Sequence, residues 1–132
     1  MRSIVMGIKQ SIGIKFYEAT YSSRKDTIFK PVLIACAIAR TDDSGYFSPA
    51  RIMKPLSAIM GKPYNTTNFS SHLAAFASEK RSNILEVREE DSGRKKYRFR
   101  NPLIQPYIVM YALNKGVINS DELSEFDHTL TV

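Results

Sequence analysis

The spacing of apolar residues changes once along this 132-residue chain, close to Arg81. Before that point apolar residues recur every three or four positions, which is typical of amphipathic helices. After it, Leu85 and Val87 alternate with charged residues, and so do Tyr97 and Phe99. A spacing of two is typical of half-buried strands, and the turn-forming stretch EDSG between the two segments predicts a β-hairpin. The chain is therefore predicted to be mainly α-helical with one small antiparallel β-sheet.

The first half of the chain contains two predicted helices. In the N-terminal one, over residues 1–21, apolar residues follow a helical spacing: Val5, Ile8, Ile12, Phe16 and Ala19. The next helix should be capped by Asp26 or Thr27 and run to about Arg40. Its stretch from Val32 to Ala39 is apolar on all sides, which predicts a central, buried helix.

Two further helices should precede the hairpin. The first should begin at the Ser-Pro pair of residues 48–49, because a capping hydroxyl followed by proline is a typical helix start. Gly61 should end it, and Pro55 should kink or divide it. The second should be capped by Thr66 or Thr67.

The order helix, short strand, helix, turn, helix, hairpin is that of a winged helix-turn-helix. Tyr46-Phe47 is expected to pair with the hairpin of residues 84–100, called the wing below, because an isolated two-stranded hairpin is only marginally stable. We expect a single domain over residues 1–118, with a winged-helix core at 26–100, extra N- and C-terminal helices at 1–21 and 101–116, and a frayed acidic tail at 119–132. The expected core residues are Leu33, Ala37, Ile52, Leu56, Phe69, Leu73, Phe76, Leu85, Val87, Tyr97 and Phe99.

The charge distribution favours a polyanionic partner. The net charge is +6, but every Lys and Arg lies between Arg2 and Lys115, and the residues after Lys115 include four acids. Up to Lys115 there are nineteen basic and nine acidic residues, a net charge of +10. Such a basic body is compatible with nucleic acid. The expected contacts with double-stranded DNA are made by Arg51, Lys54, Thr66, Thr67, Asn68, Ser71, Arg94, Lys95, Lys96, Arg98 and Arg100.

These contacts should be mainly with phosphates, because the cations gather on the wing. The helix directly before the hairpin has no Arg placed to read guanine. Weak or non-specific binding is therefore expected. Two alternatives stay open. Basic residues on edge strands also prevent sheet-to-sheet aggregation, and a winged helix without DNA binding can serve as a docking or dimerisation module.

Enzyme chemistry is not expected. His72 and His128 are the only histidines, and neither has the spacing of a metal site; Cys36 lies in the all-apolar helix as a core residue. No glycine-rich loop for nucleotide phosphates is present, so no cofactor is expected. The longest apolar run, eight residues, is too short to cross a bilayer, and no secretion signal is visible, so a cytoplasmic protein is expected.

Two stretches carry a resemblance to a known family: FKPVLIACAIARTDDSGYFSPARIMKPLSAIMGKPY and KKYRFRNPLIQPYIVMYALNKGVI. The apolar VLIACAIA helix, the GYFS turn and the YRFRNPLIQPY segment after the wing are the points of likeness, within roughly Tyr17 to Ile118. Here the chain resembles the C-terminal winged-helix region that follows the ATPase core in some prokaryotic AAA-type P-loop ATPases. The resemblance implies binding to DNA, to partner proteins or to an ATPase core, either as the accessory domain of an ATPase or as a free-standing protein.

Overall fold

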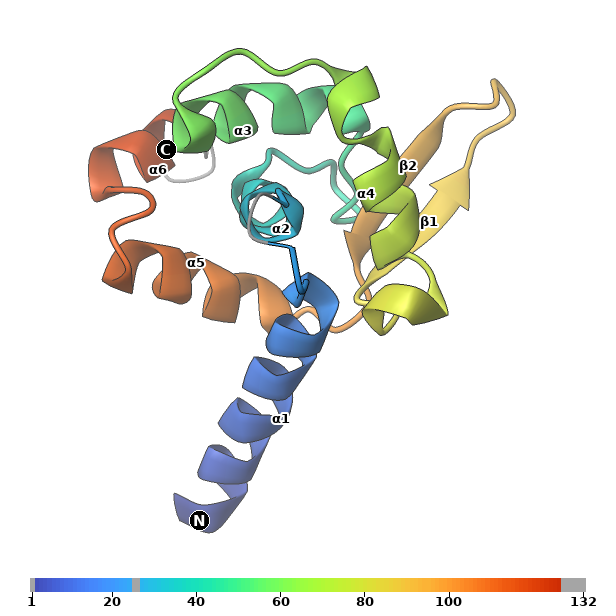
Figure 1. The fold of residues 1–132 in the computed structure, drawn as a ribbon. Helices are drawn as coiled ribbons and strands as arrows, with labels where there is room; N and C mark the ends of the chain where they lie inside the picture. Colours follow the sequence, from blue (N-terminus) through green and yellow to red (C-terminus); the bar gives the residue numbers. More distant parts are fainter. Residues whose placement is uncertain (1, 25–26, 127–132) are drawn as a thin grey trace.

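The structure is a computed structural model that describes residues 2–24 and 27–126 (Figure 1). Its elements, with η for a 3₁₀ helix, are α1 (Arg2–Thr20), α2 (Phe29–Ile38), η1 (Pro49–Ile52), α3 (Met53–Met60), η2 (Thr66–Asn68), α4 (Ser70–Phe76), η3 (Glu79–Arg81), β1 (Leu85–Glu89), β2 (Lys95–Phe99), α5 (Ile104–Asn114) and α6 (Ser120–Phe126). The protein is mainly helical with one small antiparallel sheet, as predicted. Among the described helices, none has both the length and the apolar character needed to cross a membrane.

Helix α2 forms the centre of the fold. Figure 1 looks nearly along it, with α3, α4 and α5 arranged around it. Every residue from Val32 to Ile38 is buried, which confirms the predicted central helix. The helix ends two residues before Arg40, and the position before its first turn is Ile28 without a side-chain cap. Thr27 is therefore not its cap, because the helix starts at Phe29, one residue later than a cap at Thr27 requires; Asp26 lies outside the described residues.

Pro55 does not divide the helix at its own position; the change from a 3₁₀ helix to an α-helix lies earlier, between Ile52 and Met53. The segment opens as η1 directly after Ser48 and continues as α3, in which Pro55 is the third residue. The first four N–H groups of an α-helix have no partner within it, so the missing N–H of a proline costs little there. Gly61 ends α3 as expected, with φ +72° and its N–H bonded to the Ser57 carbonyl at 2.9 Å.

The capping residue predicted at Thr66 or Thr67 lies one or two residues earlier in the structure. Asn65 is the capping residue of η2, and its side chain and that of Asn68 form a reciprocal capping box. Asn68 Oδ1 accepts the Asn65 N–H at 3.0 Å, and the Thr67 hydroxyl donates to Asn65 Oδ1. The amide side chain of asparagine can accept and donate hydrogen bonds. A threonine hydroxyl can also do both, but its side chain is shorter. Asparagine is also a preferred cap.

The C-terminal region is more ordered than the sequence predicts. The expected helix at 101–116 is observed as α5, and the tail expected to be frayed from Asn119 instead contains α6. Asn119 and Glu122 stabilise its start, because each side chain accepts the other's backbone N–H, at 2.8 and 3.1 Å. Acidic residues in a first helical turn also interact favourably with the helix dipole. Residues 127–132 lie outside the described part of the chain.

The sheet pairs β1 with β2, and its register places Leu85 opposite Phe99 and Val87 opposite Tyr97. Phe47 joins as a third, one-residue strand, because it exchanges backbone hydrogen bonds of 2.8 and 2.9 Å with Tyr97. The predicted pairing of Tyr46-Phe47 with the hairpin is thus confirmed. The predicted core is confirmed except for Val87, which is 46% exposed. Alternation identifies which face of a strand is apolar, but not how far along the strand the helices pack against that face. In β1 only Leu85 is buried.

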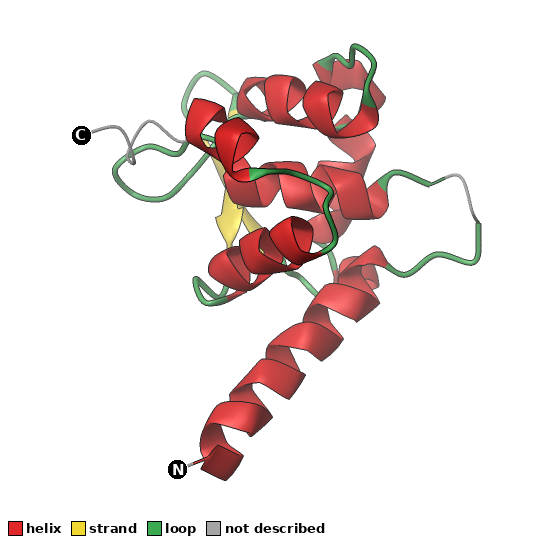
Figure 2. Cartoon of the chain, turned by 90° about the vertical axis from the view of Figure 1, so that its left-hand side faces the viewer, coloured by secondary structure: helices red, strands yellow, loops and turns green. Residues whose placement is uncertain are grey.

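Helix α1 packs on the body through its C-terminal half and projects away from it at its N-terminus, as both views show (Figures 1 and 2). Phe16 is buried against Tyr107 and Tyr111 of α5, with ring centroids 6.0 and 4.9 Å away. At Gly13 an added Cβ would lie 3.1 Å from the Tyr107 hydroxyl, so this glycine permits the close approach of α5. The side chains of Val5 and Ile8 lie outside the described part of the structure.

Candidate nucleic-acid interface

The segment that carries α3 and α4 is basic and free of carboxylates. Between Asp43 and Glu79 the chain has no Asp or Glu, but it has Arg51, Lys54 and Lys62, all exposed. We call residues 44–78 the α3–α4 segment. Arg51 belongs to η1, which contacts β2, so it lies beside the base of the wing. A polyanion approaching this segment meets no local negative charge, which favours its association.

The predicted polar contacts gather at the start of α4. Thr67, Asn68 and Ser71 are exposed, and Thr66 is half-buried. The capping box engages part of this set, because Thr67 donates to Asn65 and Asn68 accepts from it. The amide nitrogen of Asn68 and the hydroxyl of Ser71 form no hydrogen bond within residues 2–24 and 27–126. The start of α4 can therefore donate hydrogen bonds to a ligand without breaking its own cap.

His72 does not belong to this surface, because its ring is half-buried against Phe29, 4.7 Å away between centroids. Its Nδ1 is buried and has no hydrogen-bond partner among the described residues. Burial, and secondarily the nearby Arg81 guanidinium, lower the pKa of His72. The neutral imidazole is therefore the favoured form, and His72 packs as a core side chain.

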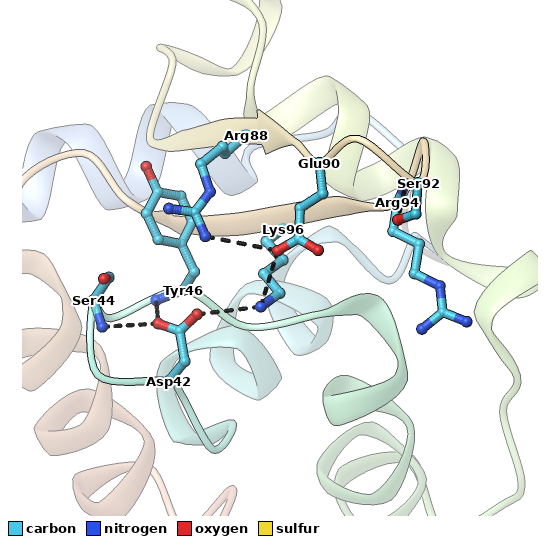
Figure 3. A network of polar contacts seen from close by, with 8 residues as sticks. All are labelled: Asp42, Ser44, Tyr46, Arg88, Glu90, Ser92, Arg94 and Lys96. Atoms are coloured by element: carbon cyan, nitrogen blue, oxygen red, sulfur yellow. Dashed lines mark hydrogen bonds and ion pairs between the residues drawn. The ribbon is translucent and has the colours of Figure 1, made fainter.

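Lys96 is bound to acidic residues on the body side of the wing. Its Nζ lies 3.1 Å from Glu90 Oε1 and 3.4 Å from Asp42 Oδ2 (Figure 3). Glu90 also lies 3.7 Å from Arg88. The hydrogen bonds that Lys96 donates, first to Glu90 and then to Asp42, raise its pKa. Two carboxylates around one ammonium group leave little charge for a phosphate.

Asp42 links this network to the turn before Phe47. Its Oδ1 accepts the backbone N–H groups of Ser44 and Tyr46, at 2.9 and 3.0 Å (Figure 3). Desolvation acts to raise the pKa of Asp42, but these two N–H groups and Lys96 together outweigh it, and the net shift is downward. Side chains of this type in a turn bond the backbone two residues on, as the DDSG stretch does here. The residue types of this stretch predict a turn, but they do not indicate that the turn contacts the wing.

Arg98 is held in a similar way. Its Nε pairs with the Glu86 carboxylate on the facing strand, and its Nη1 donates to the Ser44 carbonyl at 3.1 Å. The hydrogen bond to Glu86 raises the pKa of Arg98. Arg88 and Arg98 also both lie over the Tyr46 ring, each 4.5 Å from its centroid. Tyr46 is thus a platform for the wing, a role that the sequence did not indicate.

The remaining wing cations are differently placed. Arg94 and Lys95 are exposed at the tip and form no ion pair within residues 2–24 and 27–126. Figure 3 shows the Arg94 side chain directed away from the network around Lys96. Arg100 is exposed and donates from Nε to the Asn83 carbonyl at 3.1 Å. The five wing cations that were predicted to contact DNA therefore divide into a pair held by acidic residues, Lys96 and Arg98, and three that are not.

Comparison of the chain with protein-family models, with curated proteins and with solved structures found no match. Among the residues that the structure describes, no three His, Cys, Asp or Glu side chains are grouped so that they could hold a metal ion.

Proposed function

We propose that the protein is a winged helix-turn-helix domain that binds double-stranded DNA mainly through phosphate contacts. The observation that carries the proposal is the carboxylate-free α3–α4 segment, with exposed Arg51 and Lys54, of which Arg51 belongs to η1 beside β2. Phosphate contacts position a protein on a duplex without reading its sequence. In this assignment α4, the third helix of the winged-helix core, lies against the duplex. Its N-terminal end, with Thr66, Thr67, Asn68 and Ser71, is the end that approaches the DNA.

The wing is assigned two different tasks. Arg94 and Lys95 at its tip contact phosphates, because neither forms an ion pair with a carboxylate of the described chain, although Glu89 lies opposite Lys95 in the sheet. Lys96 and Arg98 mainly hold the wing against the Asp42 turn and Tyr46, and Arg100 flanks the base of the wing. The sequence alone treats all five as phosphate contacts. The ion pairs make the tip the better candidate.

The salt dependence of binding follows from the number of contacts. Each phosphate neutralised contributes about 0.9 to the slope of log affinity against log salt concentration. With four cations, Arg51, Lys54, Arg94 and Lys95, the slope is about 3.6, and affinity falls by about two decades between 50 and 200 mM salt.

Two double variants of equal charge test the assignment by fluorescence anisotropy on a random-sequence duplex. Arg94→Ala with Lys95→Ala should flatten the salt slope by about 1.8 and leave thermal stability unchanged, because both side chains are exposed and unpaired. Lys96→Ala with Arg98→Ala removes the same charge, but should flatten the slope by less than about half as much. Its main effect should be a lower melting temperature, since Glu86, Glu90 and Asp42 lose their partners.

Equal effects of the two variants on the slope would refute the division of the wing. The DNA proposal itself fails if the wild-type protein does not bind the duplex at low salt and high micromolar concentration.

Protein docking is the second candidate function, and a specific observation favours it. Among the side chains that the structure describes, five of the six most exposed large apolar ones lie on or directly beside α1 and α5, which contact each other: Ile14, Tyr17, Tyr21, Leu103 and Met110. Exposed apolar side chains gathered on neighbouring helices favour an interaction site. The candidate partners are a second copy of the chain and an ATPase core. Sedimentation at increasing concentration tests the first, because a strictly monomeric protein at high micromolar concentration removes the homodimer.

A further inference from the structure

A recess of about 810 Å³ lies between the end of α2, the end of β2 and the start of α5. It is on the opposite end of β2 from the wing tip. Its lining includes Arg100, a predicted DNA contact, and Met110, one of the exposed side chains of the docking candidate, but neither proposal assigns a ligand to the recess itself. Leu123 of α6 closes part of its rim. Its volume falls in the range of about 300 to 1,000 Å³ that is typical of small-molecule sites.

The walls of the recess are largely apolar. Phe47 and Phe99 contribute buried aromatic rings, and Ala37 contributes the buried face of α2. On the α5 side, Val109 is half-buried and Met110 is 58% exposed. An exposed methionine beside buried aromatic rings offers apolar surface that a ligand can cover at a gain of about 25 cal/mol per Å².

The charged lining of the recess is of one sign. Arg40, Arg98 and Arg100 line it, and none of its described lining residues is Asp or Glu. Arg98 is occupied by Glu86, whereas Arg40 and Arg100 form no ion pair within residues 2–24 and 27–126. The carbonyl of Ala37 at the end of α2, which would repel an anion, already accepts the Gln105 amide at 2.7 Å. The recess thus offers an anion the Arg40 guanidinium and the terminal nitrogens of Arg100, whose Nε donates to the Asn83 carbonyl.

We infer that this recess binds a small amphiphilic carboxylate, with its head group on Arg40 and Arg100 and its apolar body on Phe99, Val109 and Met110. Guanidinium groups bind carboxylates through two parallel hydrogen bonds, which are among the strong ones in proteins. A wholly polar anion would leave the apolar walls uncovered, and a neutral hydrocarbon would leave the guanidinium groups unused. An apolar body with one carboxylate satisfies both.

Three probes with the same ten-carbon chain test the inference: decanoate, decanol and decyltrimethylammonium. The two ionic probes are used below the concentration at which they form micelles, and decanol below its solubility limit in water. Binding is measured on the full chain by calorimetry and located by backbone amide chemical shifts. Decanoate should bind at least about tenfold more tightly than decanol, since a charge-assisted hydrogen bond contributes about 1.5–3 kcal/mol. Decyltrimethylammonium should bind most weakly, and the shifts should centre on residues 37, 99 and 109.

Arg40→Gln with Arg100→Gln should weaken decanoate binding at least about tenfold and leave decanol binding unchanged. Arg51→Gln with Lys54→Gln is the control, because it removes the same charge outside the recess. Equal affinity for the three probes, or equal loss in both variants, would show a general apolar or charge effect and overturn the inference. So would the absence of decanoate binding at about 1 mM, which corresponds to about −4 kcal/mol. No readout involves DNA, so this result is independent of the proposed function.

Discussion

Replacement of Phe47 by alanine should detach the wing from the helical body. Phe47 is 2% exposed, and its ring lies nearly parallel to that of Tyr97, 6.4 Å away between centroids. Truncation of a buried phenylalanine to alanine costs about 3–5 kcal/mol. A domain of this kind has about 5–15 kcal/mol of stability in total, so about a fifth or more is lost. The melting temperature should fall by about 10–20 °C.

The Phe47→Ala replacement should also have a local effect on the wing. The backbone hydrogen bonds between Phe47 and Tyr97 do not need the phenyl ring, but without it the ring of Tyr97 loses its cover. A two-stranded hairpin is marginally stable when nothing packs on it. Amide exchange in β2 should therefore accelerate more than exchange in α2, where the buried run from Val32 to Ile38 has other cover.

Urea unfolding followed by circular dichroism measures the free energy, and Val87→Ala is the matched control. Val87 faces the same side of the sheet as Tyr97 but is 46% exposed, so its truncation should change stability by about 0.5 kcal/mol or less. The reasoning is refuted if Phe47→Ala costs less than about 1 kcal/mol, or if the two variants cost the same.

Three further predictions concern stability. Because the pKa of His72 is lowered, first by burial and then by Arg81, the unfolded chain takes up the proton first, and stability should decrease as pH falls below about 6.5. Urea unfolding at pH 7 and 5.5 should show this loss in the wild type and less of it in His72→Gln. Arg81→Ala should cost about 1–3 kcal/mol by the same assay, since its guanidinium donates to the Ala19 and Tyr21 carbonyls at the end of α1, whereas Lys80→Ala nearby should cost little. Asn83→Ala should cost about 1 kcal/mol in thermal unfolding, because φ is +48° there and asparagine tolerates that region better than alanine; no loss would show that the turn relaxes.

Local patterns in the chain were sufficient to predict α1 to α5, the hairpin and most of the core, but not α6. The apolar run is enough to predict that α2 is buried, and the alternation is enough to predict the apolar face of β1 and β2. Helix and strand geometry fix which side chains share a side. The Ser-Pro start of η1 and the stop at Gly61 are equally local, since they depend on backbone chemistry within one turn.

The candidate interface was predictable only as a set of residues. The sequence identifies the wing cations, but Asp42 lies 54 positions from Lys96, and only the tertiary structure brings them to 3.4 Å. The same holds for the Tyr46 ring beneath Arg88 and Arg98, and for the exposure of Val87 where the helical cover of the sheet ends. Charge is a property of the chain, whereas the partner that neutralises it depends on which distant segments pack together. Periodicity therefore determined which residues face outward, and packing decided which of them are available to a ligand.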